Sequence, residues 1–166
     1  NSLNILDCLV CEQRTEQASA YIHKLAGIYR YMLQNEEETL VRLKEEMAFV
    51  GMYVDLLQVR FAEGFRVETD IPEEAFARNV VPCSVQLLIE NAIKHNAVDA
   101  SEPLVISITA TADSVTVSNT LRPKLSTTPS THVGLNYIRQ QYLDLAGIPI
   151  AIRRTDSHYC VTLPLL

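Results

Sequence analysis

Apolar residues in the first part of the chain recur every three or four positions, the spacing of one face of an α-helix. The spacing predicts a first helix that ends near Glu12, built on Leu3, Leu6, Leu9 and Val10. It predicts a second helix from Glu16 to Gln34, built on Tyr21, Leu25, Ile28, Tyr29 and Met32. The acidic run at 35–38 then breaks the pattern, and either caps a further helix or forms a solvated turn. We favour the turn.

A third helical pattern has apolar residues alternately four and three positions apart: Leu43, Met47, Val50, Val54, Leu57 and Phe61. This is the spacing of a coiled-coil-like seam, so helices are expected to pack on helices here. Such seams are commonly covered within their own chain. A helical hairpin of this length cannot cover itself on all sides, however, and a dimeric bundle is therefore plausible.

After Gly64 the pattern changes from helical to alternating, which predicts a strand that begins near Phe65 and ends before Pro72. Similar alternation predicts a hairpin over 104–119 and two more strands over 148–152 and 159–163. A helix is expected from Gly134 to Leu145, and the Ser-, Thr- and Pro-rich segment from Thr120 to His132 is expected to be a mobile loop.

The predicted strands carry apolar residues mainly on one side, which is typical of a sheet with helices on one face and solvent on the other. We therefore predict an α+β fold, a two-layer α/β sandwich of mixed or antiparallel strands preceded by a helical hairpin. The change of pattern places the domain boundary between residues 1–63 and residues 64–166.

The chain between Val81 and Asn96 predicts one amphipathic helix, with Pro82 in its first turn. Its expected buried stripe consists of Val85, Leu88, Ile89, Ala92 and Ile93. At about 100° per residue, four polar residues fall side by side on the opposite face: Glu90, Asn91, Lys94 and His95. We call them the polar arc. A carboxylate, an amide oxygen, a cation and an imidazole suit a magnesium–phosphate ligand, although a solvated helix face is the alternative.

Composition narrows the range of partners and compartments. A net charge of -6 and a pI near 5.2 argue against nonspecific binding to nucleic acid or to anionic membranes. No apolar run is long enough to cross a membrane and no signal peptide is present, so we expect a soluble piece. The chain also begins at Asn1 without an initiator Met, apparently within a helix, so we expect it to be part of a longer protein.

The cysteines fit a reducing compartment, the cytoplasm, better than a disulfide framework. Cys8 and Cys11 form a CxxC pair, but no second pair stands at zinc-binding spacing. Their apolar neighbours indicate a buried helix face rather than a metal site.

The segment Leu88–His95 resembles the N-box of the LytS-type sensor histidine kinases. Asn1–Asn4 resembles the end of their His-Phe-Leu-Phe-Asn-Ser-Leu-Asn phosphoacceptor motif, and similar residues stand at Arg30-Tyr31, Arg60-Phe61 and Pro82. The resemblance spans the whole chain. It implies a Bergerat-type (GHKL) ATP-binding domain over 64–166, with part of the dimerisation and histidine-phosphotransfer helices before it.

The resemblance also implies roles for individual residues. Asn91 would give its side-chain oxygen to Mg²⁺, and Glu90, the catalytic candidate, would orient water or polarise the metal's surroundings. Lys94 and His95 would lie near the phosphates of ATP. Gly134-Leu135 resembles the second glycine box, where backbone N–H groups at a helix N-terminus meet phosphate oxygens. The segment 120–132 would be the nucleotide lid.

Three departures from the family pattern bear on activity. The phosphoacceptor histidine would lie upstream of Asn1, so this chain cannot phosphorylate itself by that route. The family's adenine-reading Asp aligns with Asn119, and no glycine follows it. The family's Gly-x-Gly-Leu and following Asn appear as His132-Val133-Gly134-Leu135 and Tyr137, which puts side chains where backbone should approach phosphate. A degenerate kinase that acts as a scaffold, or another GHKL ATPase, therefore stands beside the kinase as an alternative.

The resemblance implies partners as well. They are a second copy of the chain, joined through the N-terminal helices, and a response regulator, for which the LytTR type is one candidate. The parent protein would be anchored in the membrane upstream, with this portion in the cytoplasm. No nucleic acid is expected among the partners.

Overall fold

The computed structural model describes residues 2–124 and 133–166. Asn1, His132 and most of the predicted loop from Thr120 to His132 therefore lie outside the described residues. The three N-terminal helices are α1 (Ser2–Cys11), α2 (Thr15–Gln34) and α3 (Leu43–Phe61), close to the predicted ranges. Asn35 ends α2, where its backbone N–H and its side-chain Nδ2 both donate to the carbonyl of Tyr31. The acidic run is thus a turn, as favoured.

The predicted strands form one mixed sheet with the order β2-β4-β5-β7-β6. Its strands are β2 (Phe65–Asp70), β4 (Leu104–Ala110), β5 (Ser114–Thr120), β6 (Ala151–Arg154) and β7 (His158–Pro164). β2 runs parallel to β4, and the other neighbours are antiparallel. The remaining helices are α4 (Ser84–His95) and α5 (Val133–Ala146), and Gly147 follows α5 with a φ of 64°.

Short elements that the sequence patterns did not predict complete the chain. β1 (Val41–Arg42) and β3 (Asn79–Val80) form a separate antiparallel pair. The 3-10 turns η1 (Ala62–Gly64) and η2 (Glu73–Ala77) flank β2. These pieces are too short to show a hydrophobic period.

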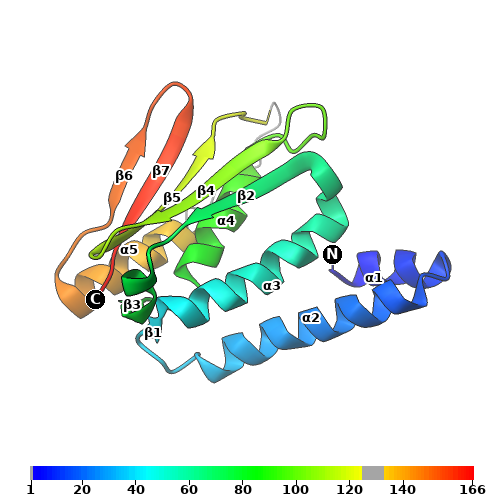
Figure 1. Ribbon diagram of the computed structural model, residues 1–166, viewed down its shortest axis with the longest axis horizontal. Helices are drawn as coiled ribbons and strands as arrows, with labels where there is room; N and C mark the ends of the chain where they lie inside the picture. The colour runs from blue at the N-terminus through cyan, green and yellow to red at the C-terminus, as the bar shows by residue number, and fades with distance from the viewer. Residues whose placement is uncertain (1, 125–132) are drawn as a thin grey trace.

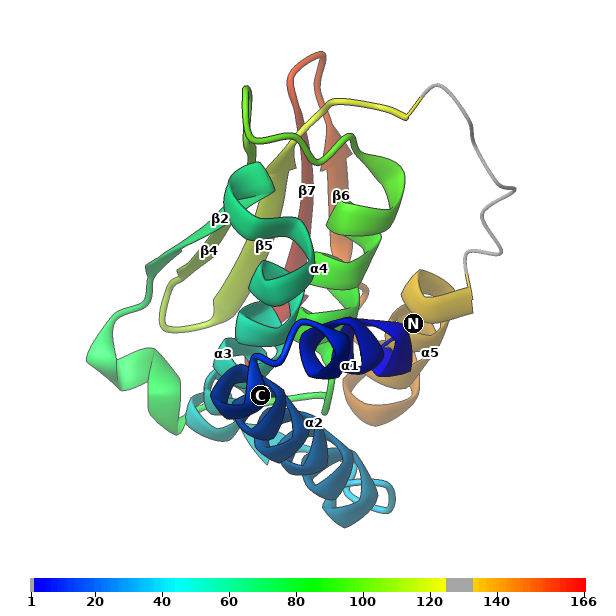
Figure 2. The ribbon, with the colours of Figure 1, turned by 90° about the vertical axis from the view of Figure 1, so that its right-hand side faces the viewer.

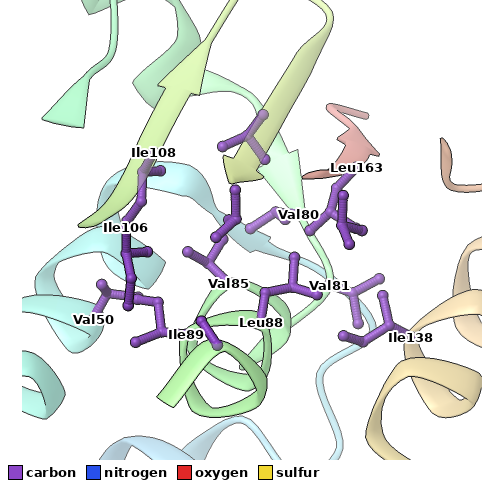
Figure 3. Close-up of a cluster of buried hydrophobic side chains, with 14 of the residues drawn as sticks. Val50, Val80, Val81, Val85, Leu88, Ile89, Ile106, Ile108, Ile138 and Leu163 are labelled. Atoms are coloured by element: carbon purple, nitrogen blue, oxygen red, sulfur yellow. The ribbon is translucent and has the colours of Figure 1, made fainter. Parts of the chain in front are cut away.

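The elements are arranged in layers (Figures 1 and 2). Helices α3, α4 and α5 cover one face of the sheet, and α2 lies on the far side of α3 from the sheet. The larger core fills the space between sheet and helices with side chains such as Ile106, Ile108, Ile89 and Leu163 (Figure 3). A smaller core joins α1, α2 and α3 around Tyr21, Ile28 and Phe49. The predicted two-layer sandwich behind a helical hairpin is confirmed.

The apolar seam of α3 packs within the chain rather than against a second copy. Leu43 and Val50 are buried in the larger core, and Met47, Val54, Leu57 and Phe61 pack against it. The seam is therefore covered by the sheet side of the same chain, which is the commoner of the two outcomes expected for it. Helix α3 presents a second face, with Phe49 and Leu56, to the smaller core. The boundary between residues 63 and 64 stays a prediction.

Three local predictions are wrong. The strand predicted over 148–152 is shifted along the chain and begins only at Ala151. Pro82 lies in the turn before α4, which begins at Ser84 after Cys83 in the left-handed region with a φ of 60°. Cys8 and Cys11 are exposed rather than buried, because the covered residue of α1 is Leu9 and α2 packs on only one side of this short helix. None of the helices in the described ranges combines the length and apolar character needed to span a bilayer.

Candidate nucleotide site

The polar arc lies on α4 as predicted. All five residues of the expected stripe are buried in the larger core, whereas Glu90 and Lys94 are exposed and Asn91 and His95 are half-buried. Gln86, one turn earlier, donates from Nε2 to Glu90 Oε2 at 3.0 Å. Burial, with a smaller contribution from the Glu90 carboxylate, raises the pKa of Tyr53 on α3 to about 12. The Glu90 end of the arc therefore lies toward α3.

The C-terminal end of α4 is held by the segment that leaves β5. Lys124 Nζ donates to the carbonyls of Ile93 and Lys94 at 2.9 and 3.0 Å, and its backbone N–H donates to the carbonyl of His95 at 3.2 Å. A cation at this position also compensates the negative end of the helix dipole. The backbone N–H of Arg122 donates to Asn96 Oδ1 at 2.8 Å. The C-terminal end of the polar arc is thus held in place by residues that follow β5.

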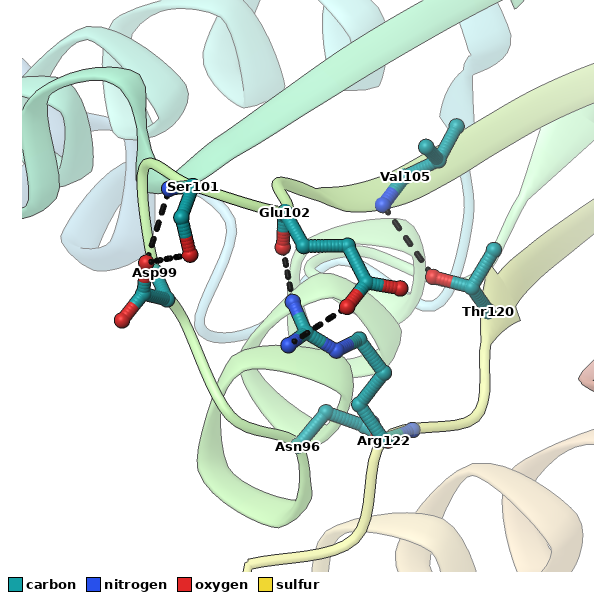
Figure 4. Close-up of polar contacts among 7 residues, drawn as sticks. All are labelled: Asn96, Asp99, Ser101, Glu102, Val105, Thr120 and Arg122. Carbon is teal, nitrogen blue, oxygen red and sulfur yellow. Dashed lines mark hydrogen bonds and ion pairs between the residues drawn. The ribbon is translucent and has the colours of Figure 1, made fainter.

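Arg122 holds the same segment to the loop before β4 (Figure 4). Its guanidinium group forms an ion pair with the Glu102 carboxylate at 3.0 Å and also donates to the Glu102 carbonyl. In the same loop, the side chain and backbone N–H of Ser101 donate to Asp99 and hold the pKa of that carboxyl below its usual range. The sequence showed no sign of Lys124 or Arg122, because their partners lie 20 to 31 residues away.

Asn119 lies near the end of β5 with its side chain on the helix-covered face, since it alternates with the core residues Val115 and Val117. It is only 6% exposed, and its Nδ2 donates to the carbonyl of Thr120 at 2.8 Å. On the neighbouring strands it is paired with Ile106 and Tyr159.

Gly134 and Leu135 lie in the first turn of α5. A Cβ atom on Gly134 would come within 3.6 Å of Leu87 Cδ2, so this turn lies against α4. Leu135 packs on the larger core, and Tyr137 is 51% exposed. The seven predicted residues therefore lie on α4, β5 and α5, and both of the latter elements pack on α4.

The polar arc suits Mg²⁺ bound together with a nucleotide better than a metal ion held by protein side chains alone. No cluster of three His, Cys, Asp or Glu side chains within residues 2–124 and 133–166 is placed to hold a metal ion. Mg²⁺ commonly takes one or two protein oxygens and completes its shell with phosphate oxygens and water. Asn91, the residue that the family resemblance assigns to Mg²⁺, suits that division. A pocket of about 410 Å³ lies elsewhere, lined by Gln58, Ala62, Glu63, Phe65, Arg66 and Pro103, and none of the predicted site residues lines it.

Sequence reasoning missed Glu46, a buried carboxyl on α3 that contacts the N-terminal end of α4. A signal was present, because Glu46 lies three residues after Leu43 and four before Val50, on the apolar face of α3. A charged residue in such a stripe indicates a buried polar contact.

Comparison with known sequences gives three matches. A family model described as "Histidine kinase" matches residues 1–65. The sensor protein LytS of Staphylococcus saprophyticus is 32% identical over 95 residues, which cover 57% of this chain and 16% of LytS. The sensor histidine kinase BtsS of Escherichia coli K12 is 25% identical over 99% of this chain and 30% of BtsS. The chain therefore spans less than a third of the length of these relatives.

A solved structure has the same fold. The catalytic domain of histidine kinase ThkA, in a nucleotide-free form, superposes with a TM-score of 0.53 at 18% identity, over 75% of this chain and 95% of that domain. At that identity the likeness concerns the fold alone. The chain is thus similar in sequence to LytS-type sensor proteins and to a sensor histidine kinase, and similar in fold to a histidine kinase catalytic domain.

Proposed function

We propose that this chain is the cytoplasmic ATP-binding portion of a sensor histidine kinase, and that it transfers the γ-phosphoryl group of Mg-ATP to a histidine upstream of Asn1. The observation that carries the proposal is the polar arc on α4, set opposite a fully buried stripe in a fold shared with histidine kinase catalytic domains. Phosphoryl transfer needs mainly placement and charge neutralisation, which such an arc supplies.

Each residue of the proposed site has its own role in binding Mg-ATP. Asn91 holds Mg²⁺ through its side-chain oxygen, and Glu90 orients water or polarises the metal's surroundings. Lys94 and His95 lie beside the phosphates, and the backbone N–H groups of Gly134 and Leu135 meet phosphate oxygens at the start of α5. Asn119 accepts a hydrogen bond from the adenine amine. Bound Mg-ATP supplies the phosphoryl group and its electrophilic phosphorus.

Partners follow from the same proposal. We expect a homodimer through α1 and α2, a response regulator, for which the LytTR type is one candidate, and a membrane anchor upstream in the parent protein. Support comes from the sensor-protein relatives and from exposed apolar side chains on α1 and α2, such as Leu3 and Leu33.

Two departures from the family pattern favour a second function. Asn119 is neutral at the adenine position and already donates to the Thr120 carbonyl, and Tyr137 stands where the family has Asn. A degenerate kinase that acts as a scaffold would tolerate both departures. The parent protein with its upstream histidine distinguishes the functions. The kinase forms acid-labile phosphohistidine from labelled ATP, a scaffold forms none, and another GHKL ATPase releases phosphate without labelling a histidine.

A further inference from the structure

The N-terminal end of α4 lacks a cap of its own. The first backbone N–H groups of a helix have no partner within the helix, and a Ser, Thr, Asp or Asn usually accepts from them. Here the residue before the helix is Cys83, and its side chain forms no capping hydrogen bond. The acceptor is instead a side chain from α3, far away in the sequence.

Glu46 supplies that acceptor. Its Oε1 accepts from the backbone N–H of Val85 at 3.0 Å, and its Oε2 accepts from the backbone N–H of Cys83 at 2.9 Å. The residue is 0% exposed. A buried carboxyl costs stability unless its oxygens are hydrogen-bonded, so Glu46 and the first turn of α4 hold each other in place.

The same carboxyl is joined to α2. Tyr31 donates from its hydroxyl to Glu46 Oε2 at 2.8 Å, the oxygen that also accepts from Cys83. The ring of Tyr31 stacks on Phe49 of α3, with centroids 4.1 Å apart and planes 10° apart. Tyr31 lies in the last turns of α2. One oxygen atom therefore connects the end of α2 to the start of α4.

We infer that Tyr31 and Glu46 form a junction through which the position of α2 sets the position of α4. The helix so positioned carries Glu90, Asn91, Lys94 and His95, and in this respect the inference rests on the proposed function. Glu46 and Tyr31 are positioning residues, because they touch the helix that carries the site rather than the nucleotide. A displacement of α2 by a sensor domain or by the partner helices would reach the site by this route.

Amide hydrogen exchange tests the junction without any nucleotide. Tyr31→Phe keeps the stacked ring and removes only the hydroxyl, so it leaves the fold intact and frees the Glu46 carboxyl from α2. We expect exchange at the Cys83 and Val85 amides to accelerate on the order of tenfold, while the sheet amides of Ile106 and Val117 keep wild-type rates. Tyr21→Phe is the matched control, a buried α2 tyrosine in the same smaller core, and should leave α4 unchanged.

The result that overturns the junction is exchange at Cys83 and Val85 that stays at the wild-type rate in Tyr31→Phe. Uniform acceleration over the sheet and α4 together overturns it too, since that is the signature of lost global stability.

A second measurement separates this inference from the proposed function. If wild type binds Mg-ATP, Tyr31→Phe should raise the Kd by about threefold or more and Tyr21→Phe should not; equal Kd values for all three proteins overturn the transmission. If wild type binds no Mg-ATP, the proposed function fails, and the exchange result alone decides whether α2 positions α4.

Discussion

Asn91 is the residue on which the proposed magnesium site depends. It is half-buried on α4, beside the exposed Glu90, and its amide oxygen suits a hard cation. An aspartate at this position keeps an oxygen ligand, whereas an alanine removes it. We therefore expect Asn91→Ala to weaken Mg-dependent nucleotide binding by about tenfold or more, and Asn91→Asp to weaken it less.

Titration calorimetry with Mg-ATP on the three proteins checks this order. Equal affinities for wild type and both variants would mean that Asn91 lies on a solvated helix face, the alternative that the sequence left open.

Glu46 carries a prediction about pH. Burial outweighs its hydrogen bonds to Tyr31 and to the backbone of α4, and raises the pKa of the carboxyl above the value of 4.5 for an unperturbed glutamate. Protonation of this carboxyl is therefore easier in the folded state than in the unfolded chain. The contribution of this carboxyl to the free energy of unfolding is full below the unfolded pKa and is lost as the pH rises through the folded pKa.

Urea unfolding of wild type and Glu46→Gln, at intervals between about pH 4 and pH 8, measures this contribution. The unfolding free energy of wild type relative to the variant should fall as the pH rises. If the difference in unfolding free energy between the two proteins is constant, or grows with pH, burial does not raise the pKa of the Glu46 carboxyl.

Helix α3 shows which features of an element local sequence patterns predict and which they do not. Its range and its apolar seam were predicted, as were the buried stripe of α4 and the alternation of β4 and β5, because each shows in local spacing. The partner of the seam was left open, since a four-three spacing is the same against a second helix and against a sheet. Contacts such as Glu46 to Val85 and Lys124 to Ile93 join distant residues, so no local pattern contains them.

The packing of α3 is tested by two identical substitutions on the same helix. Val50 is 2% exposed and lies in the larger core, whereas Val59 is 47% exposed. Val50→Ala should lower the free energy of unfolding by about 2 kcal/mol, through lost burial and the cavity left behind. Val59→Ala should change it by less than about 0.5 kcal/mol. Equal effects in urea unfolding would mean that the seam is not buried within the chain.

At the scale of the whole molecule, the sheet order β2-β4-β5-β7-β6 and the layer of α3, α4 and α5 match the predicted sandwich. The sequence indicated the fold class because strands with one apolar side need a helical layer. The candidate site followed from a motif on one helix and from family resemblance. The packing of β5 and α5 against α4 could be seen only in the structure.

Apolar side chains that this chain leaves exposed on α1 and α2 include Leu3 at 71%, Val10 at 59% and Leu33 at 70%. Because the seam of α3 is covered, we expect these side chains to form the surface of the proposed dimer. We expect sedimentation to show self-association at high micromolar concentration, and Leu33→Lys to weaken it severalfold. Val59→Lys, on α3, is the control. A monomer at that concentration, or equal loss in both variants, would count against a dimer through α1 and α2.

The proposed Mg-ATP site on α4 can be tested by calorimetric titration of the wild-type chain with ATP. One titration contains Mg²⁺ and the other contains EDTA. We expect saturable heat with Mg²⁺, and an affinity at least severalfold weaker in EDTA, because Asn91 would then have no metal ion through which to act on the phosphates. Absence of saturable heat in both titrations, from a protein whose unfolding transition remains cooperative, would contradict it.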